Sequence, residues 1–157
     1  MKKDYLNRIY GSVFILIFLF LTFSEYERIL NPVPDFVASG RYIDYSILLY
    51  LSRWIIYLFV LIAGVAMFFK SKRVNLFLLI FSVTVVLEIY FNNAIYIIKS
   101  LTGYPKYILF GLSILCLVVV GFSLLKTKKT SFIEIFLSFI LAITIVYLPN
   151  ALITFYF

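Results

Sequence analysis

Five long runs of apolar residues follow one another along the chain, separated by short polar segments. The runs cover residues 9–23, 46–69, 74–98, 107–125 and 132–157. The last four are long enough for a helix to cross about 30 Å of hydrocarbon at about 1.5 Å per residue. The pattern predicts an all-α membrane protein, a five-helix transmembrane bundle that forms a single integral membrane domain over residues 1–157.

The first run is shorter than the others and is marginal as a span. It crosses a bilayer only if Tyr5 and Leu6 extend the helix and Arg8 reaches the headgroups. The basic residues before the run are also typical of a signal peptide. However, the run ends in Leu-Thr-Phe-Ser at residues 21–24, which lacks the small residues of a cleavage site. We therefore expect a retained first helix.

The composition supports a membrane class and excludes several others. Of the 157 residues, 64% are hydrophobic and 13% are charged, whereas a soluble domain has about half its residues apolar and about a quarter charged. A soluble enzyme, a nucleic-acid-binding module and a disordered tail are therefore excluded. The chain has no histidine and one cysteine, so we expect no metal site and no cofactor. Cys116 lies within an apolar run and is expected to be a small buried side chain.

The basic residues predict how the chain is oriented in the membrane. Nine of them lie on one side of the predicted spans: Lys2, Lys3, Arg8, Lys70, Lys72, Arg73, Lys126, Lys128 and Lys129. Four lie on the other side: Arg28, Arg41, Lys99 and Lys106. The positive-inside rule places the N-terminus in the cytoplasm and, after five crossings, the C-terminus outside. We expect a multi-pass protein of the cell (inner) membrane, whose net charge of +7 requires no nucleic-acid partner.

Two opposite charges lie within predicted spans, where charged side chains are costly. Arg53 precedes the basic turn at residues 70–73, and Glu88 follows that turn at a similar separation along the chain. Both side chains are therefore expected about 22–25 Å above the cytoplasmic turn between their helices. We predict that Arg53 and Glu88 form an intramembrane ion pair in the outer third of the membrane. The pair is either a structural clip or part of a ligand or ion site; alternatively, Arg53 snorkels outward.

Further polar residues share the faces of these two charges. Residues at a spacing of three or four lie on one side of a helix. The third run carries Thr84, Glu88, Asn92 and Tyr96 at every fourth position, and the second run carries Tyr50, Arg53 and Tyr57. The fifth run brings Tyr147 and Asn150 to a similar level, near a kink expected at Pro149. These nine residues predict a polar cluster that could form a pocket open to the outside.

Three other features of the sequence lead to expectations. Glu25 is assigned to the long outer loop, residues 24–45. Glu134 follows the last basic segment and is expected to face headgroups or that segment. The small residues Ala63, Gly64 and Ala66 would allow another helix to approach closely.

The polar residues favour binding over catalysis. The aspartates all lie outside the predicted spans, a Ser–His pair is impossible, and Arg53 would hold Glu88 ionised. We therefore expect no enzyme, but a non-catalytic binding protein or a subunit of a membrane complex. Its expected partners are the lipid bilayer and, in addition, a membrane protein, a lipid or a small molecule. The alternative is a small ion- or proton-coupled transporter or channel subunit that works as an oligomer, with Glu88 and Asn92 holding a cation.

Overall fold

The computed structural model describes residues 2–26, 46–94, 103–122 and 130–156. This part of the chain holds five helices and no strand: α1 Lys2–Ser24, α3 Ser46–Phe68, α4 Val74–Ala94, α5 Gly103–Gly121 and α6 Phe132–Tyr156. The all-helical prediction is therefore confirmed for these residues. The predicted ends at residues 98 and 125 lie outside the described part.

The first helix is longer than its apolar run. α1 has 23 residues and begins at Lys2, so Arg8 lies within it. Tyr5–Ser24 and Tyr104–Gly121 are the two helical segments, among the described residues, that are long and apolar enough to cross a membrane. Arg53–Phe68, Val74–Tyr90 and Phe132–Tyr147 are shorter apolar segments. Length and composition thus support two of the five predicted spans.

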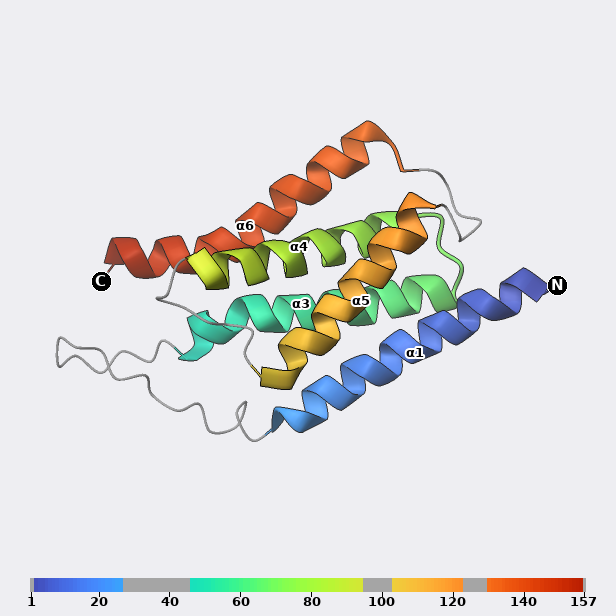
Figure 1. The fold of residues 1–157 in the computed structure, drawn as a ribbon, viewed down its shortest axis with the longest axis horizontal. Helices are drawn as coiled ribbons and strands as arrows, with labels where there is room; N and C mark the ends of the chain where they lie inside the picture. Colours follow the sequence, from blue (N-terminus) through green and yellow to red (C-terminus); the bar gives the residue numbers. More distant parts are fainter. Residues whose placement is uncertain (1, 27–45, 95–102, 123–129, 157) are drawn as a thin grey trace.

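The helices run back and forth between two ends of the molecule (Figure 1). One end carries the N-terminus, the α3–α4 turn, the end of α5 and the start of α6. The opposite end carries the end of α1, the starts of α3 and α5, and the C-terminus. α4 packs against α3, α5 and α6, and α3 packs against α1. α6 changes direction in its last third, the part that contains Pro149, as expected for proline within a helix (Figure 1).

The centre of the bundle is α4, whose residues from Leu78 to Val85 are all buried. A helix that is apolar on every side is stable only when neighbours cover it. The larger core cluster joins α1, α3, α4 and α5, and includes an edge-to-face contact between Phe14 and Phe81 at 6.4 Å between ring centroids. A smaller cluster joins α4 to Ala142 of α6.

α1 and α3 meet backbone to backbone at two glycines. A Cβ atom built on Gly11 would lie 2.7 Å from the Gly64 oxygen and 2.7 Å from the Phe68 nitrogen. A Cβ atom on Gly64 would lie 2.9 Å from the Phe14 Cβ. The expectation that another helix approaches closely at Gly64 is therefore confirmed, and the approaching helix is α1.

Short local motifs end α3 and begin α6. At the end of α3, the N–H of Lys70 donates to the oxygen of Met67 and the N–H of Ser71 to that of Ala66. With Lys70 at φ 55°, this is a Schellman motif, which allows the sharp return into α4. At the start of α6, the Ser131 N–H donates to Glu134 Oε2 at 2.8 Å, and the Glu134 N–H donates to Ser131 Oγ at 3.2 Å. Glu134 thus forms a capping box with Ser131. From the sequence, Glu134 is expected to face headgroups or the basic segment, and this helix cap was not predicted.

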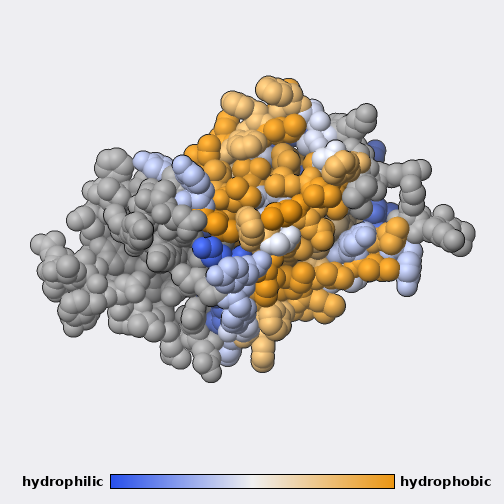
Figure 2. Space-filling model, in the orientation of Figure 1, coloured by the Kyte–Doolittle hydropathy of each residue, from blue (hydrophilic) through white to orange (hydrophobic). Residues whose placement is uncertain are grey.

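Much of the outer surface is apolar. Large hydrophobic side chains are exposed along α1, α5 and α6, and Figure 2 shows them gathered in a broad band across the described surface. More hydrophilic residues lie at the edges of this band (Figure 2). A soluble monomer rarely exposes a contiguous apolar surface of this kind.

Candidate functional site

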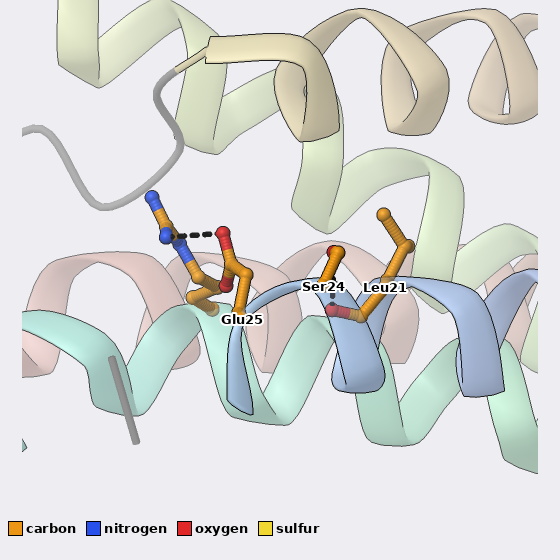
Figure 3. Close-up of polar contacts among 4 residues, drawn as sticks. Leu21, Ser24 and Glu25 are labelled. Carbon is orange, nitrogen blue, oxygen red and sulfur yellow. Dashed lines mark hydrogen bonds and ion pairs between the residues drawn. The ribbon is translucent and has the colours of Figure 1, made fainter. Parts of the chain in front are cut away.

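A buried ion pair lies at the end of the bundle opposite the N-terminus. Arg53, on α3, is 1% exposed, and its Nη1 atom donates to Glu25 Oε1 at 2.7 Å (Figure 3). Glu25 is 4% exposed and follows the last residue of α1. Burial of both charges excludes the interpretation that Arg53 snorkels to the surface of the bundle, since its charged end is held inside by a carboxylate.

The end of α1 positions Glu25. The Glu25 N–H donates to the Leu21 oxygen at 3.2 Å. The Ser24 hydroxyl donates to the same oxygen at 2.8 Å (Figure 3). Leu21 is fully buried in the core, which fixes this turn against α3. Glu25 therefore lies directly after α1, at the start of the segment to which the sequence assigns it, but its carboxylate is turned inward and buried.

Three core stripes end on charged residues near this level. At the end of α1, the charged residue is Glu25, which follows the buried positions Gly11, Phe14 and Leu21. On α3, it is Arg53, which shares its face with Ile56, Val60, Ala63 and Met67. On α4, it is Glu88, which follows Val74, Leu78, Phe81 and Val85. The steps of three, four or seven residues keep each stripe on one face of its helix. In each stripe, the described buried position nearest this end of the bundle is therefore charged.

The α3–α4 hairpin brings Glu88 to the depth of Arg53. The stretch from Arg53 to the end of α3 at Phe68 is nearly as long as the stretch from the start of α4 at Val74 to Glu88. In two antiparallel helices these stretches correspond to about 22 Å and about 21 Å from the turn. Glu88 is 3% exposed. Its direct pairing with Arg53 stays a prediction, while the ion pair described for Arg53 is with Glu25.

Tyr57 completes the cluster from the next turn of α3. Its side chain is fully buried, interacts electrostatically with Glu25 and Arg53, and lies within electrostatic range of Tyr104 on α5. Its ring makes an edge-to-face contact with Trp54 at 5.6 Å. The Tyr57 hydroxyl lies near the Glu25 carboxylate, but within the described structure it does not meet the distance and angle of a hydrogen bond. A buried hydroxyl in this position is available to a polar partner.

The other predicted site residues divide into three groups. The buried Thr84 hydroxyl donates to the Ile80 oxygen of its own helix at 2.7 Å, so it does not extend the cluster. Tyr147 is 51% exposed on α6. The remaining four lie outside the residues whose side chains are described: Tyr50, Asn92, Tyr96 and Asn150.

Glu25 was not identified from the sequence as a residue of the site, although the spacing of the apolar residues before it contained a signal. Residues 11, 14, 18, 21 and 25 follow the spacing of one helix face, so Glu25 continues the stripe of α1 beyond the last apolar residue. Serine at position 131 followed by glutamate at 134 is likewise the sequence pattern of the capping box that the structure contains.

The cluster combines a carboxylate–guanidinium pair with a tyrosine hydroxyl in an apolar surrounding. Such a set can hold helices together or bind a polar group, while a carboxylate bonded to arginine is a poor general acid or base. No group of three His, Cys, Asp or Glu suited to a metal ion occurs among the described residues. Comparison of the chain with protein-family models, curated proteins and solved structures gave no match.

Proposed function

We propose that this chain is a multi-pass integral membrane protein whose five helices all lie in the bilayer. The apolar surface of α6 supports this proposal beyond the two longest spans. Ten large apolar or aromatic side chains are exposed along it: Phe132, Ile133, Ile135, Phe136, Leu137, Phe139, Ile140, Leu141, Ile143 and Tyr147. Contact of such an apolar surface with lipid has no free-energy cost, whereas its contact with water is unfavourable.

The charges at the two ends support an orientation. The described basic residues at the N-terminal end of the bundle include Arg8 in α1 and Lys70, Lys72 and Arg73 at the α3–α4 turn. Lys126, Lys128 and Lys129 lie outside the described residues. We infer that this end faces the cytoplasm, which places the C-terminus and the Glu25–Arg53 cluster toward the outside.

Within this frame, we propose a non-catalytic binding protein or subunit of a membrane complex. The observation that carries this function is the buried cluster of Glu25, Arg53 and Tyr57, with a tyrosine hydroxyl that makes no hydrogen bond among the described residues. Burying charges is costly, and apolar residues of similar size would often hold the helices equally well. A polar group of a lipid, a small molecule or a partner helix would satisfy the Tyr57 hydroxyl and explain why the charges are kept.

Removal of one hydroxyl tests this proposal. Wild type, Tyr57→Phe and the control Tyr147→Phe are purified in mild detergent and examined by native mass spectrometry for bound small molecules or protein subunits. Since only Tyr57 lies in the cluster, the bound mass should fall several-fold in Tyr57→Phe and stay unchanged in Tyr147→Phe. Recovery of the wild-type chain always alone, without any bound mass, would contradict a binding function.

Burial of a second carboxylate, Glu88, near this level favours the alternative of a proton- or ion-coupled transporter or channel subunit. A proton-flux assay in liposomes compares wild type with Glu88→Gln, and with Glu134→Gln, which removes an acid at the opposite end. Loss of flux in Glu88→Gln alone would support the alternative. Equal flux in all three proteins would remove its proton-coupled form.

A further inference from the structure

A second feature lies in the half of the bundle that carries the N-terminus. A shallow apolar groove there encloses about 20 Å³, and about 250 Å³ of empty space, which includes open space outside the bundle, lies over its lining side chains. Its walls come from α1 and α5, which diverge toward this end (Figure 1), and its floor from α3 and α4. The lining side chains are Tyr10 and Phe14, Met67, Leu78, and Leu115, Cys116 and Val119.

The groove lies just below a concentration of positive charge. Met67 precedes Lys70 by three residues and Leu78 follows Arg73 by five, so the floor begins about 5–8 Å from the α3–α4 turn. Lys72 and Arg73 are exposed at this turn, and the acidic Glu134 near this end is engaged in its capping box. The apolar groove thus leads away from a basic rim that Lys72 and Arg73 form.

We propose that a segment of an acyl chain of an anionic phospholipid lies in the groove, with the phosphate of the lipid at the basic α3–α4 turn. The proposal rests on the membrane insertion proposed above. The accessible lining of the groove is apolar, which favours an apolar occupant. Val13 and Val118, the sequence neighbours of the lining residues Phe14 and Val119, are exposed and apolar, which would allow a bilayer lipid to enter sideways.

Charge complementarity selects the headgroup. Basic residues near a membrane surface attract anionic lipids and leave zwitterionic ones with little net gain. Lys106 lies at the opposite end of α5, and the described groove does not extend to it. The anionic lipid should therefore bind at this one end of the bundle.

Lipid titration of the purified full chain in non-ionic detergent tests the proposal. Native mass spectrometry compares adducts of phosphatidylglycerol and phosphatidylcholine with identical acyl chains. We expect half-maximal phosphatidylglycerol binding at a concentration at least fivefold lower than that of phosphatidylcholine. Lys72→Gln should weaken phosphatidylglycerol binding by about fivefold, the effect of one basic residue near a membrane surface, while Lys106→Gln leaves it unchanged.

The acyl-chain half of the site is tested by filling the groove. Leu115 is half exposed at the rim, so Leu115→Trp should block the groove without disturbing the core, and both lipids should bind at least fivefold more weakly. Leu117→Trp, on the exposed side of α5 away from the groove, is the matched control. Val119→Phe provides a second filled groove if Leu115→Trp is misfolded by circular dichroism.

Two results would overturn the proposal. One is equal affinity for the two lipids; the other is a dimer that Leu115→Trp dissociates while lipid adducts persist, which would assign the groove to a second copy. Membrane insertion is read separately, by extraction of cell membranes with alkaline carbonate. Release of the chain by carbonate would refute the membrane proposal, whereas the adduct titration of the purified chain would still decide the groove.

Discussion

At the scale of single residues, the Glu25–Arg53 pair joins the end of α1 to α3. Both side chains are almost fully buried, and their contact at 2.7 Å is that of a charge-assisted hydrogen bond. A buried pair adds little to stability compared with apolar residues, but removal of one partner leaves a buried charge and costs about 3–5 kcal/mol. The pair therefore acts as a constraint on which residues of α1 and α3 face each other.

Charge exchange should identify which carboxylate is the partner that matters to Arg53. Arg53→Glu alone should lower the free energy of unfolding by at least about 3 kcal/mol. Combining it with Glu25→Arg should recover a substantial part of that loss, because the pair is restored with the charges reversed. Thermal unfolding in mild detergent, followed by fluorescence-detected size exclusion, measures the difference.

The corresponding exchange with Glu88 serves as the comparison. If Arg53→Glu is rescued by Glu88→Arg and not by Glu25→Arg, then Glu88 is the dominant partner of Arg53 and Glu25 is not. Glu134→Arg is the control, since that residue lies at the opposite end of the bundle. It should lose only its helix cap, about 1 kcal/mol, and should rescue nothing.

The residues of this site show what the sequence can and cannot specify. Burial of Arg53 and Tyr57 follows from the apolar runs around them, and the depth of Glu88 follows from counting along a hairpin. The choice of Glu25 as partner depends on how α1 is rotated against α3, which the glycine contact decides. That rotation is a property of two packed helices and is not readable from either run alone.

Lys70 carries the second prediction at this scale. Its φ of 55° lies in the left-handed region, which costs a residue with a Cβ about 1–2 kcal/mol. Lys70→Gly should therefore raise the free energy of unfolding by about 0.5–1 kcal/mol, after the added chain entropy of glycine is subtracted. Lys72→Gly removes the same charge from the same turn without relieving such strain. Equal effects of the two changes on the unfolding midpoint would contradict this explanation.

At the scale of helices, the Gly11–Gly64 contact determines how closely α1 packs on α3. The atoms that crowd a Cβ on Gly11 belong to the backbone of α3, so they cannot turn aside as a flexible side chain could. The same two helices also carry the ion pair, with Arg53 on α3 and Glu25 directly after α1. The glycine contact and the ion pair thus join α1 to α3 at two separate levels of the bundle.

We expect Gly11→Ala to destabilise the protein by about 1–3 kcal/mol, the usual cost of overpacking a close contact. Gly111→Ala is the matched control, because a Cβ atom there meets nothing within 4 Å. It should be neutral or slightly stabilising, since alanine favours the helix. Unfolding midpoints measured in the same detergent give the comparison, and equal losses in the two variants would show that the glycine contact is not responsible.

The helices themselves were largely predictable from the sequence. Apolar runs and the basic or glycine-containing segments between them place α3 and α4 within one residue of their observed starts. α1 and α5 were the exceptions: α1 begins seven residues and α5 four residues before its apolar run. Both added segments carry charged residues, because a charge is excluded from a hydrocarbon span but not from a helix that extends beyond it. Apolarity therefore indicates where lipid can be, and hydrogen bonding decides where the helix ends.

At the scale of the whole molecule, charge and apolar surface are arranged along one axis. The apolar band lies in the middle, the basic residues at the N-terminal end, and the buried ion pair toward the other end. A protein inserted across a bilayer needs this order, because the band must match the hydrocarbon and the basic end remains in the cytoplasm. The groove and the charged cluster would then face opposite leaflets.

This arrangement predicts which positions a reagent can reach from outside the cell. In a Cys116→Ser background, single cysteines are introduced at exposed positions near each end: Tyr26→Cys and Tyr104→Cys near the cluster, Phe69→Cys and Phe122→Cys near the basic end. A membrane-impermeant maleimide applied to intact cells should label the first two at least tenfold more than the others. After the cells are permeabilised, all four should react. Labelling of the second pair alone would mean the inverse orientation, and equal labelling of all four in intact cells would refute insertion across the membrane.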